Sequence, residues 1–358
     1  MQEKYFAASN SSEGFKNYFC DIFGTADFLY IIKGGPGTGK SSFMLRQAES
    51  AMEKGCRVEF YYCSSDPDSI DGILIRTDER RVGIIDGTPP HVSEPKYPGA
   101  YDEIINLGAF WNRDLLIKQK NEIMALCDRK SAEYKNAYTF LRSVGNLRAV
   151  NDALIFEAVD QEKMRAAAKR ILAHIPELNK GVATFRTALI DSVSMNGRVR
   201  FNTFEKRAKR LYLVGDVYGA GHMFLNIVSE LLGDFNVNVR ISYDPICAKH
   251  VDAIFIEGAD TAFVLCDGAD EALRADANGE VVQDETRTFI NVKRFIDADK
   301  LRENRSEIRY TAHLAQNSLD GALHALSKAK IYHFLLEDIY GKAMHWRKKD
   351  EFEKNFVL

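Results

Sequence analysis

A glycine-rich motif near the N-terminus has the residue types and spacing of a phosphate-binding loop. Residues 34–41 read Gly-Gly-Pro-Gly-Thr-Gly-Lys-Ser, a full match to the pattern G-x-x-x-x-G-K-[ST]. The apolar run 28–32 precedes the motif, and a helical pattern follows it from Ser42. Glycines allow successive backbone N–H groups to turn toward one anion, and the N-terminus of a helix adds a favourable dipole. The motif therefore predicts a site for a nucleoside triphosphate with Mg²⁺.

The motif also predicts what its individual side chains do. Lys40 is expected to reach the β- and γ-phosphates, and the Ser41 hydroxyl is expected to bind Mg²⁺. Asp86 ends the apolar strand pattern 82–86, which is typical of a Walker-B carboxylate that holds Mg²⁺ directly or through water. Ser41 and Asp86 are therefore the predicted metal ligands. The predicted nucleotide-binding residues are Gly35, Pro36, Gly37, Thr38, Gly39, Lys40, Ser41 and Ser42.

The predicted catalytic residues are Lys40, Asp86 and two candidates for the group that orients water. Many ATPases place a glutamate directly after the Walker-B aspartate, but Gly87 stands there in this chain. Asp66, which follows a predicted strand, and His91, in the loop after Asp86, are candidates for that role. Asp66 also fits a turn before a proline, and a loop histidine is more often solvated than catalytic.

The second half of the chain repeats the first. The segment that begins at Phe28 aligns with the segment that begins at Arg210, and the predicted strand 57–62 aligns with 239–243. Recurrence of Asp71 in the second half favours a structural role for that residue. The collinear matches predict a tandem duplication. Three pairs of acidic residues match. Asp66 pairs with Asp244, and each precedes a proline. Asp71 pairs with Asp252 and Asp86 with Asp267, and the distance from Asp71 to Asp86 equals that from Asp252 to Asp267.

Each half also ends in a long helical pattern with one apolar stripe. The two stripes step alternately by four and three positions, which is the spacing of a coiled-coil seam. Lys130 interrupts the first stripe at a core position. Further helical patterns cover about 150–175 and 331–356. The stripes are Ile123, Cys127, Lys130, Tyr134, Ala137, Leu141 and Val144 in the first half, and Ile308, Ala312, Ala315, Leu319, Ala322, Leu326 and Ala329 in the second.

The second copy of the glycine-rich motif has lost the side chains that bind a triphosphate. His222 replaces Lys40, and Met223 replaces Ser41. Asp216 replaces the first glycine, so a carboxylate would repel phosphate there. We expect a degenerate site that no longer binds a triphosphate in the ordinary way. The alternative is a modified site that binds another ligand.

Composition narrows the class of protein. The chain has 358 residues, which favours two domains, and its net charge of −3 does not indicate a nucleic-acid-coating protein. It contains no apolar stretch as long as a membrane span, and its N-terminus lacks the layout of a signal peptide. The six cysteines have no CxxC spacing, which favours reduced thiols in a cytoplasmic protein over a metal site.

Longer strings around these motifs resemble a little-characterised bacterial family of tandem P-loop ATPases. They are residues 31–42, Cys63–Gly72, Asp86–His91 and Tyr97–Gly108. The resemblance covers nearly the whole chain and implies ATP binding and a duplicated P-loop fold, with no known substrate. Both repeats can carry intact P-loops in that family, whereas this sequence departs from the pattern in its second copy.

These patterns predict an α/β fold with two tandem P-loop NTPase-like domains, 1–180 and 181–358, each with a long helical extension. We expect a cytoplasmic protein that binds Mg-ATP, a slow ATPase or ATP-driven switch with one active and one degenerate site. The lack of an Asn-Lys-x-Asp motif favours ATP over GTP. One alternative is a small-molecule or nucleotide kinase, with Arg76, Arg80 and Arg81 near the acceptor. Another is a non-hydrolysing, nucleotide-gated protein whose stripes bind a partner; a homo-oligomer is also compatible with the sequence.

Overall fold

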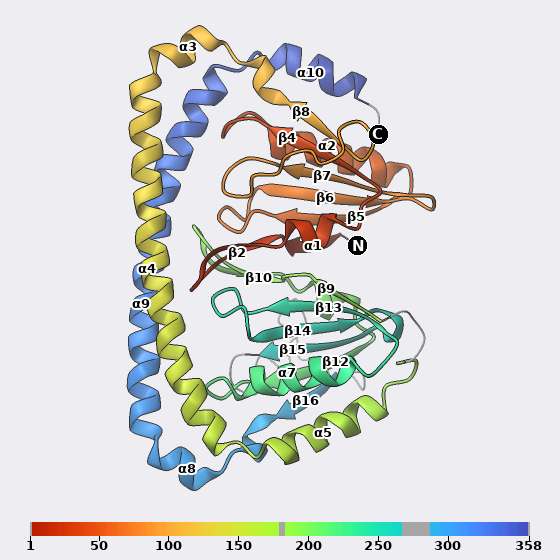
Figure 1. Ribbon diagram of the computed structural model, residues 1–358, viewed down its shortest axis with the longest axis vertical. Helices are drawn as coiled ribbons and strands as arrows, with labels where there is room; N and C mark the ends of the chain where they lie inside the picture. The colour runs from red at the N-terminus through yellow and green to blue at the C-terminus, as the bar shows by residue number, and fades with distance from the viewer. Residues whose placement is uncertain (1, 179–182, 267–286, 357–358) are drawn as a thin grey trace.

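Two similar six-stranded sheets lie one above the other along a pair of long helices (Figure 1). The computed structural model describes residues 2–178, 183–266 and 287–356. In sheet order, the first sheet contains β1 (Glu3–Phe6), β5 (Arg57–Tyr62), β6 (Ile70–Arg76), β7 (Arg81–Asp86), β4 (Phe28–Lys33) and β8 (Asp102–Asn106). The second sheet contains β9 (Thr184–Thr187), β13 (Asn238–Tyr243), β14 (Val251–Ile256), β15 (Thr261–Cys266), β12 (Arg210–Gly215) and β16 (Arg287–Asn291).

The two sheets share one topology. In each, the third strand of this order, β6 or β14, is antiparallel to both neighbours, and the remaining pairs are parallel. Their central strands are apolar and buried because helices or the other half cover both faces. The matching strand order confirms the predicted α/β fold and is consistent with a tandem duplication.

Three of the apolar cores among the described residues lie on the two sheets. One lies between the first sheet and α2 (Lys40–Glu53), and its counterpart lies between the second sheet and α7 (Ala220–Leu232). The third joins the two halves and includes Phe6, Tyr61 and Phe255. Short helices α1 (Phe19–Phe23) and α6 (Thr203–Arg207) contribute to it. The two halves therefore bury side chains against each other.

Two hairpins exchange hydrogen bonds between the halves. They are β2–β3 (Ala8–Ser11 and Gly14–Asn17) and β10–β11 (Asp191–Ser194 and Gly197–Arg200). The Ser192 hydroxyl donates to the Ser64 carbonyl at 2.9 Å, and the Ser12 hydroxyl donates to the Ile246 carbonyl at 2.9 Å. Each hairpin thus contacts the loop that follows the second strand, β5 or β13, of the other half.

The long helices α4 (Lys120–Ala158) and α9 (Arg305–Lys342) form an antiparallel pair (Figure 1). Their predicted stripes face each other, with Ala137, Leu141 and Leu326 in one core. A side chain on Gly321 would lie 2.8 Å from the Phe140 ring, so glycine permits the close approach of the helices. None of the described helices is long and apolar enough to span a membrane.

Each long helix connects its own half to the opposite one. The chain enters α4 through η1 (Leu107–Phe110) and α3 (Arg113–Lys118) beside the first sheet, and α4 ends beside the second sheet, where α5 (Gln161–Ala173) packs on α7. It enters α9 through η3 (Val292–Phe295) and α8 (Ala298–Glu303), and α9 returns to the first sheet. The short helix η2 (Glu257–Ala259) instead connects β14 to β15. There α10 (Trp346–Asn355) places Phe352 against Phe43 of α2.

The helix predicted over about 150–175 is two helices. α4 ends at Ala158, and Asp160 caps α5 by accepting a hydrogen bond from the Lys163 backbone N–H at 2.9 Å. The same interruption separates α9 from α10 near the end of the chain. The breaks allow the terminal helices to turn back onto the sheets.

Candidate functional site

The first glycine-rich loop, residues 34–39, connects β4 to α2 in the strand–loop–helix arrangement that the motif predicts. Gly37 and Gly39 have φ values of 68° and 80°, in the left-handed region that favours glycine. The buried Thr38 hydroxyl donates to the Gly35 carbonyl at 2.9 Å and fixes the turn. The loop thus has the backbone conformation that its glycines were expected to provide.

Lys40 and Asp86 lie together at one edge of the sheet. Asp86 ends β7, which pairs in parallel with β4, and its carboxylate lies 3.4 Å from the Lys40 ammonium. The ammonium also donates to the carbonyls of Gly34 and Gly35, at 3.1 and 2.8 Å. Ser41 accepts a hydrogen bond from the Ile70 backbone N–H at 3.1 Å, so its hydroxyl lies beside the start of β6.

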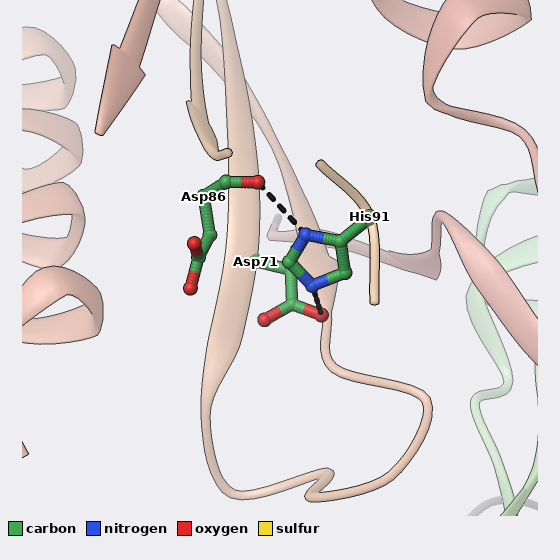
Figure 2. A group of neighbouring side chains, drawn as sticks. All are labelled: Asp71, Asp86 and His91. Carbon is green, nitrogen blue, oxygen red and sulfur yellow. Dashed lines mark hydrogen bonds and ion pairs between the residues drawn. The ribbon is translucent and has the colours of Figure 1, made fainter. Parts of the chain in front are cut away.

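His91 is a buried residue of this edge, not a solvated loop histidine. Its side chain is 5 % exposed and stacks on Phe19 with ring centroids 4.8 Å apart. Figure 2 shows its ring between two acidic residues: Nδ1 lies 2.9 Å from the Asp86 carbonyl, and Nε2 lies 3.2 Å from the Asp71 carboxylate. Burial alone would lower the pKa of His91, but Asp71 and Asp86 raise it to about 8.

Asp71 belongs to the candidate site. The pairing of β5 with β6 shifts at this point, because Tyr61 pairs with Gly72 and Tyr62 pairs with Ile70. A bulge of this kind redirects a side chain, and here it directs Asp71 toward His91. Asp252 occupies the equivalent bulge in the second half, where it pairs with Arg200 at 2.7 Å. The aspartate that was expected to be structural therefore contacts the site in the first half.

Asp66 lies in the turn after β5. Among the described residues, no hydrogen bond connects its side chain to Lys40, Asp86 or His91. Its carboxylate accepts a hydrogen bond from the Asp68 backbone N–H at 3.4 Å, as a turn aspartate does. Burial raises its pKa. The geometry fits the turn role, and it places the carboxylate near α9, where His333 acts on it electrostatically.

The proposed match of Asp66 with Asp244 is wrong by three residues. Asp244 directly follows β13, and its N–H donates to the His250 carbonyl at 2.8 Å. The residue in the same place in the first half is Cys63, whose N–H donates to the Ser69 carbonyl at 3.0 Å. The Asp-Pro dipeptide recurs in both halves, but it falls at different positions of two similar loops.

Residues of the second half cover the first glycine-rich loop. A side chain on Gly37 would lie 2.4 Å from the Glu337 carbonyl, and one on Gly35 would lie 3.1 Å from the Tyr340 ring. Both contacts come from α9, while Lys349 of α10 lies against Gly39. A hydrogen bond from His333 lowers the pKa of Glu337, and Lys40 and the Gly37 N–H act in the same direction. The motif gave no signal for these contacts because they come from the other half.

The second glycine-rich loop, residues 216–219, binds its own carboxylate. Asp216 accepts hydrogen bonds from the N–H groups of Gly219, at 3.0 and 3.2 Å, and of Gly221, at 2.7 Å. The loop is also shorter: four residues connect β12 to α7, against six between β4 and α2. Asp267, the expected counterpart of Asp86, lies outside the described residues. The Asp216 carboxylate thus accepts hydrogen bonds from backbone N–H groups of the kind that a phosphate would need.

A cavity of about 200 Å³ lies beside the second loop. His222 does not point along the loop as Lys40 does; its Nδ1 lies 3.0 Å from the Val251 carbonyl, and its ring stacks on His250. The cavity is lined by charged residues that pair with one another, and its apolar wall includes Ala315 and Leu319 of α9. Among the charged lining residues are Arg148, Asp152, Arg198, Asp216, Asp244 and His250.

The three arginines expected near a kinase acceptor lie at the opposite edge of the first sheet. Arg76 pairs in register with Arg81, whereas Gly72 and Ile85 pair at the edge that carries Asp86. Arg76 contacts Glu59 at 2.8 Å. These residues therefore do not face the first glycine-rich loop.

Comparison of the chain with family models, curated proteins and solved structures gives no match to any of them.

Proposed function

We propose that this protein binds Mg-ATP in the first glycine-rich loop and has one functional nucleotide site per chain. The observation that carries the proposal is the position of Lys40: it begins α2 after a left-handed glycine, 3.4 Å from Asp86 on the neighbouring strand. A loop of backbone N–H groups, a fixed ammonium and a nearby carboxylate are the parts that bind a triphosphate and its metal.

The residues around Asp86 fit a magnesium ion. Mg²⁺ prefers hard oxygen ligands and takes one or two carboxylates together with substrate phosphates. One oxygen of Asp86 accepts hydrogen bonds from Thr88, at 2.6 and 2.9 Å, and the other faces Lys40. The Ser41 hydroxyl supplies a second oxygen at the start of α2. When bound, Mg²⁺ would neutralise charge on the transferred phosphoryl group.

The two candidates for orienting water, His91 and Asp66, support slow hydrolysis because His91 is not an efficient general base here. A protonated His91 cannot accept a proton from water, so we assign it to holding Asp71 and the main chain of Asp86 in place. Asp66 is the remaining predicted candidate for orienting water. Lys40 positions the phosphates, and positioning with charge stabilisation supplies most of the rate in phosphoryl transfer.

The contacts of α9 and α10 support a switch. Glu337, Tyr340 and Lys349 lie against three glycines of the loop, and all three belong to the second half of the chain. Nucleotide in the loop would therefore change contacts of the paired helices. The second half would serve as scaffold and regulator, because Asp216 fills its own loop.

Thermal unfolding with ligand tests this proposal. A ligand that binds only the folded protein raises the melting temperature with concentration. We expect Mg-ATP to raise it for the wild type and for His222→Ala, and EDTA to reduce the rise. Lys40→Ala should abolish the rise. An equal rise in Lys40→Ala would show that ATP binds elsewhere. Free phosphate among the products would indicate hydrolysis, and bound ATP without turnover would indicate a switch alone.

A further inference from the structure

Lys130 of α4 faces the first glycine-rich loop. Asp152 of α4 lies against Gly219, and Glu337 of α9 lies against Gly37, so these two residues are counterparts in the two halves. Lys130 and Ala315 are as far apart in the sequence as Asp152 and Glu337, so they are counterparts as well. Ala315 lines the cavity beside the second loop. In the first half, the side chain at that position is therefore a lysine directed at the loop.

Neighbouring residues on the stripe place Lys130 on the Asp86 side of the loop. Burial raises the pKa of Tyr134, one turn along α4, and Ser65, in the segment that follows β5, lies close enough to act against that shift. Tyr138, one turn further, donates to Asn10 at 3.0 Å, and Asn10 contacts Ser65 at 3.5 Å. α4 thus crosses the sheet edge beyond Asp86, where Lys40 and the metal ligands would place the terminal phosphate.

The Lys130 ammonium is half-buried and has no ion-pair or hydrogen-bond partner within residues 2–178, 183–266 and 287–356. Burial lowers its pKa, and the ammonium of Lys40 lowers it further. Glu337 acts on Lys130 electrostatically, but its carboxylate pairs with His333 at 3.5 Å. An unpaired cation beside another cation costs free energy, which a bound anion would offset.

We propose that Lys130 is a second phosphate-binding cation, which contacts the terminal phosphate of a triphosphate held in the first glycine-rich loop. This inference rests on the proposed function. It makes the α4–α9 pair part of the nucleotide site. It also predicts discrimination of triphosphate from diphosphate, because only the triphosphate reaches Lys130.

The test compares Lys130→Met, Lys130→Arg and, as a matched control, Lys135→Met at an exposed position of the same helix. Melting temperature is measured without nucleotide, and affinity is measured for a Mg-bound non-hydrolysable ATP analogue and for Mg-ADP. Lys130→Met should raise the melting temperature of the nucleotide-free protein. It should weaken binding of the analogue by about tenfold to a hundredfold, the usual effect of a charged hydrogen bond, and change ADP binding far less. Lys130→Arg should retain most of the affinity for the analogue.

Three results would overturn the inference. The first is unchanged affinity of Lys130→Met for the ATP analogue. The second is equal loss of both nucleotides with a lower melting temperature, which would make Lys130 a structural residue. The third is a wild type that binds no triphosphate, which would also overturn the proposed function; the first two leave that function intact.

Discussion

The Glu337 carbonyl occupies the space that a side chain on Gly37 would need. The two residues belong to different halves of the chain, yet a Cβ on Gly37 would lie only 2.4 Å from that oxygen. Gly37 also has a left-handed backbone. The loop of the first half is therefore shaped against a helix of the second.

Replacing Gly37 by alanine should destabilise the protein strongly. Gly55 is the matched control, because its φ of 83° is also left-handed but a Cβ there would meet nothing within 4 Å. Gly55→Ala should cost about 1 kcal/mol of unfolding free energy from backbone strain. Gly37→Ala should cost about 1–3 kcal/mol more, since α9 must shift. Urea unfolding measures both, and equal costs would mean that α9 does not lie on the loop.

The His91–Asp71 pair should make stability depend on pH near neutrality. The pKa of His91 is raised from 6.5 to about 8 in the folded protein, so its contribution is complete below pH 6.5 and is lost as pH rises through 8. The contribution is about 2 kcal/mol. Unfolding free energies of the wild type and His91→Gln should converge across that range. A constant difference between pH 6 and 9 would contradict the assigned ion pair.

Removing the Asp216 carboxylate should destabilise the second loop without creating a nucleotide site. Asp216→Ala leaves two backbone donors near the start of α7 unsatisfied, which costs about 1–2 kcal/mol. The control Asp299→Ala, at an exposed ion pair, should cost less than about 0.5 kcal/mol. ATP should gain no second site, because His222 stands at the position of Lys40 but its ring points to the Val251 carbonyl and not along the loop. Tight binding of a second nucleotide to Asp216→Ala would show that the carboxylate alone closed the site.

A buried ion pair between the sheets should hold the two halves in register. Arg240 lies 2.9 Å from Glu59, and both side chains are buried. Arg240→Met should cost about 3 kcal/mol because it removes one partner of a buried pair. Although burial raises it, Arg240 and Arg76 lower the pKa of Glu59 to about 2, so its contribution is present above pH 4.5 and is lost as pH falls toward 2. A double variant, Arg240→Met with Glu59→Leu, should cost less than the sum of the single changes.

The sequence was sufficient for features that depend on local pattern. The glycine motif predicted a strand, a loop and a helix, and the repeat predicted two similar halves. The position of Asp86 beside Lys40 followed from a strand that ends in aspartate. Pairing between Asp71 and His91 was not predicted, because a β-bulge and a loop conformation bring them together.

Features that depend on contacts between the halves could not be read from the sequence. The apolar stripes showed that α4 and α9 each have a packed face, but periodicity does not identify the partner. In the sequence, Lys130 is only an interruption of the first apolar stripe. Only the antiparallel crossing of the two helices shows that this position faces the glycine-rich loop.

Isothermal titration of the full chain with Mg-ATP counts the nucleotide sites directly. We expect one site per chain in the wild type and in His222→Ala, and none in Lys40→Ala. Two sites in the wild type, or a site that persists in Lys40→Ala, would contradict binding at the first glycine-rich loop alone.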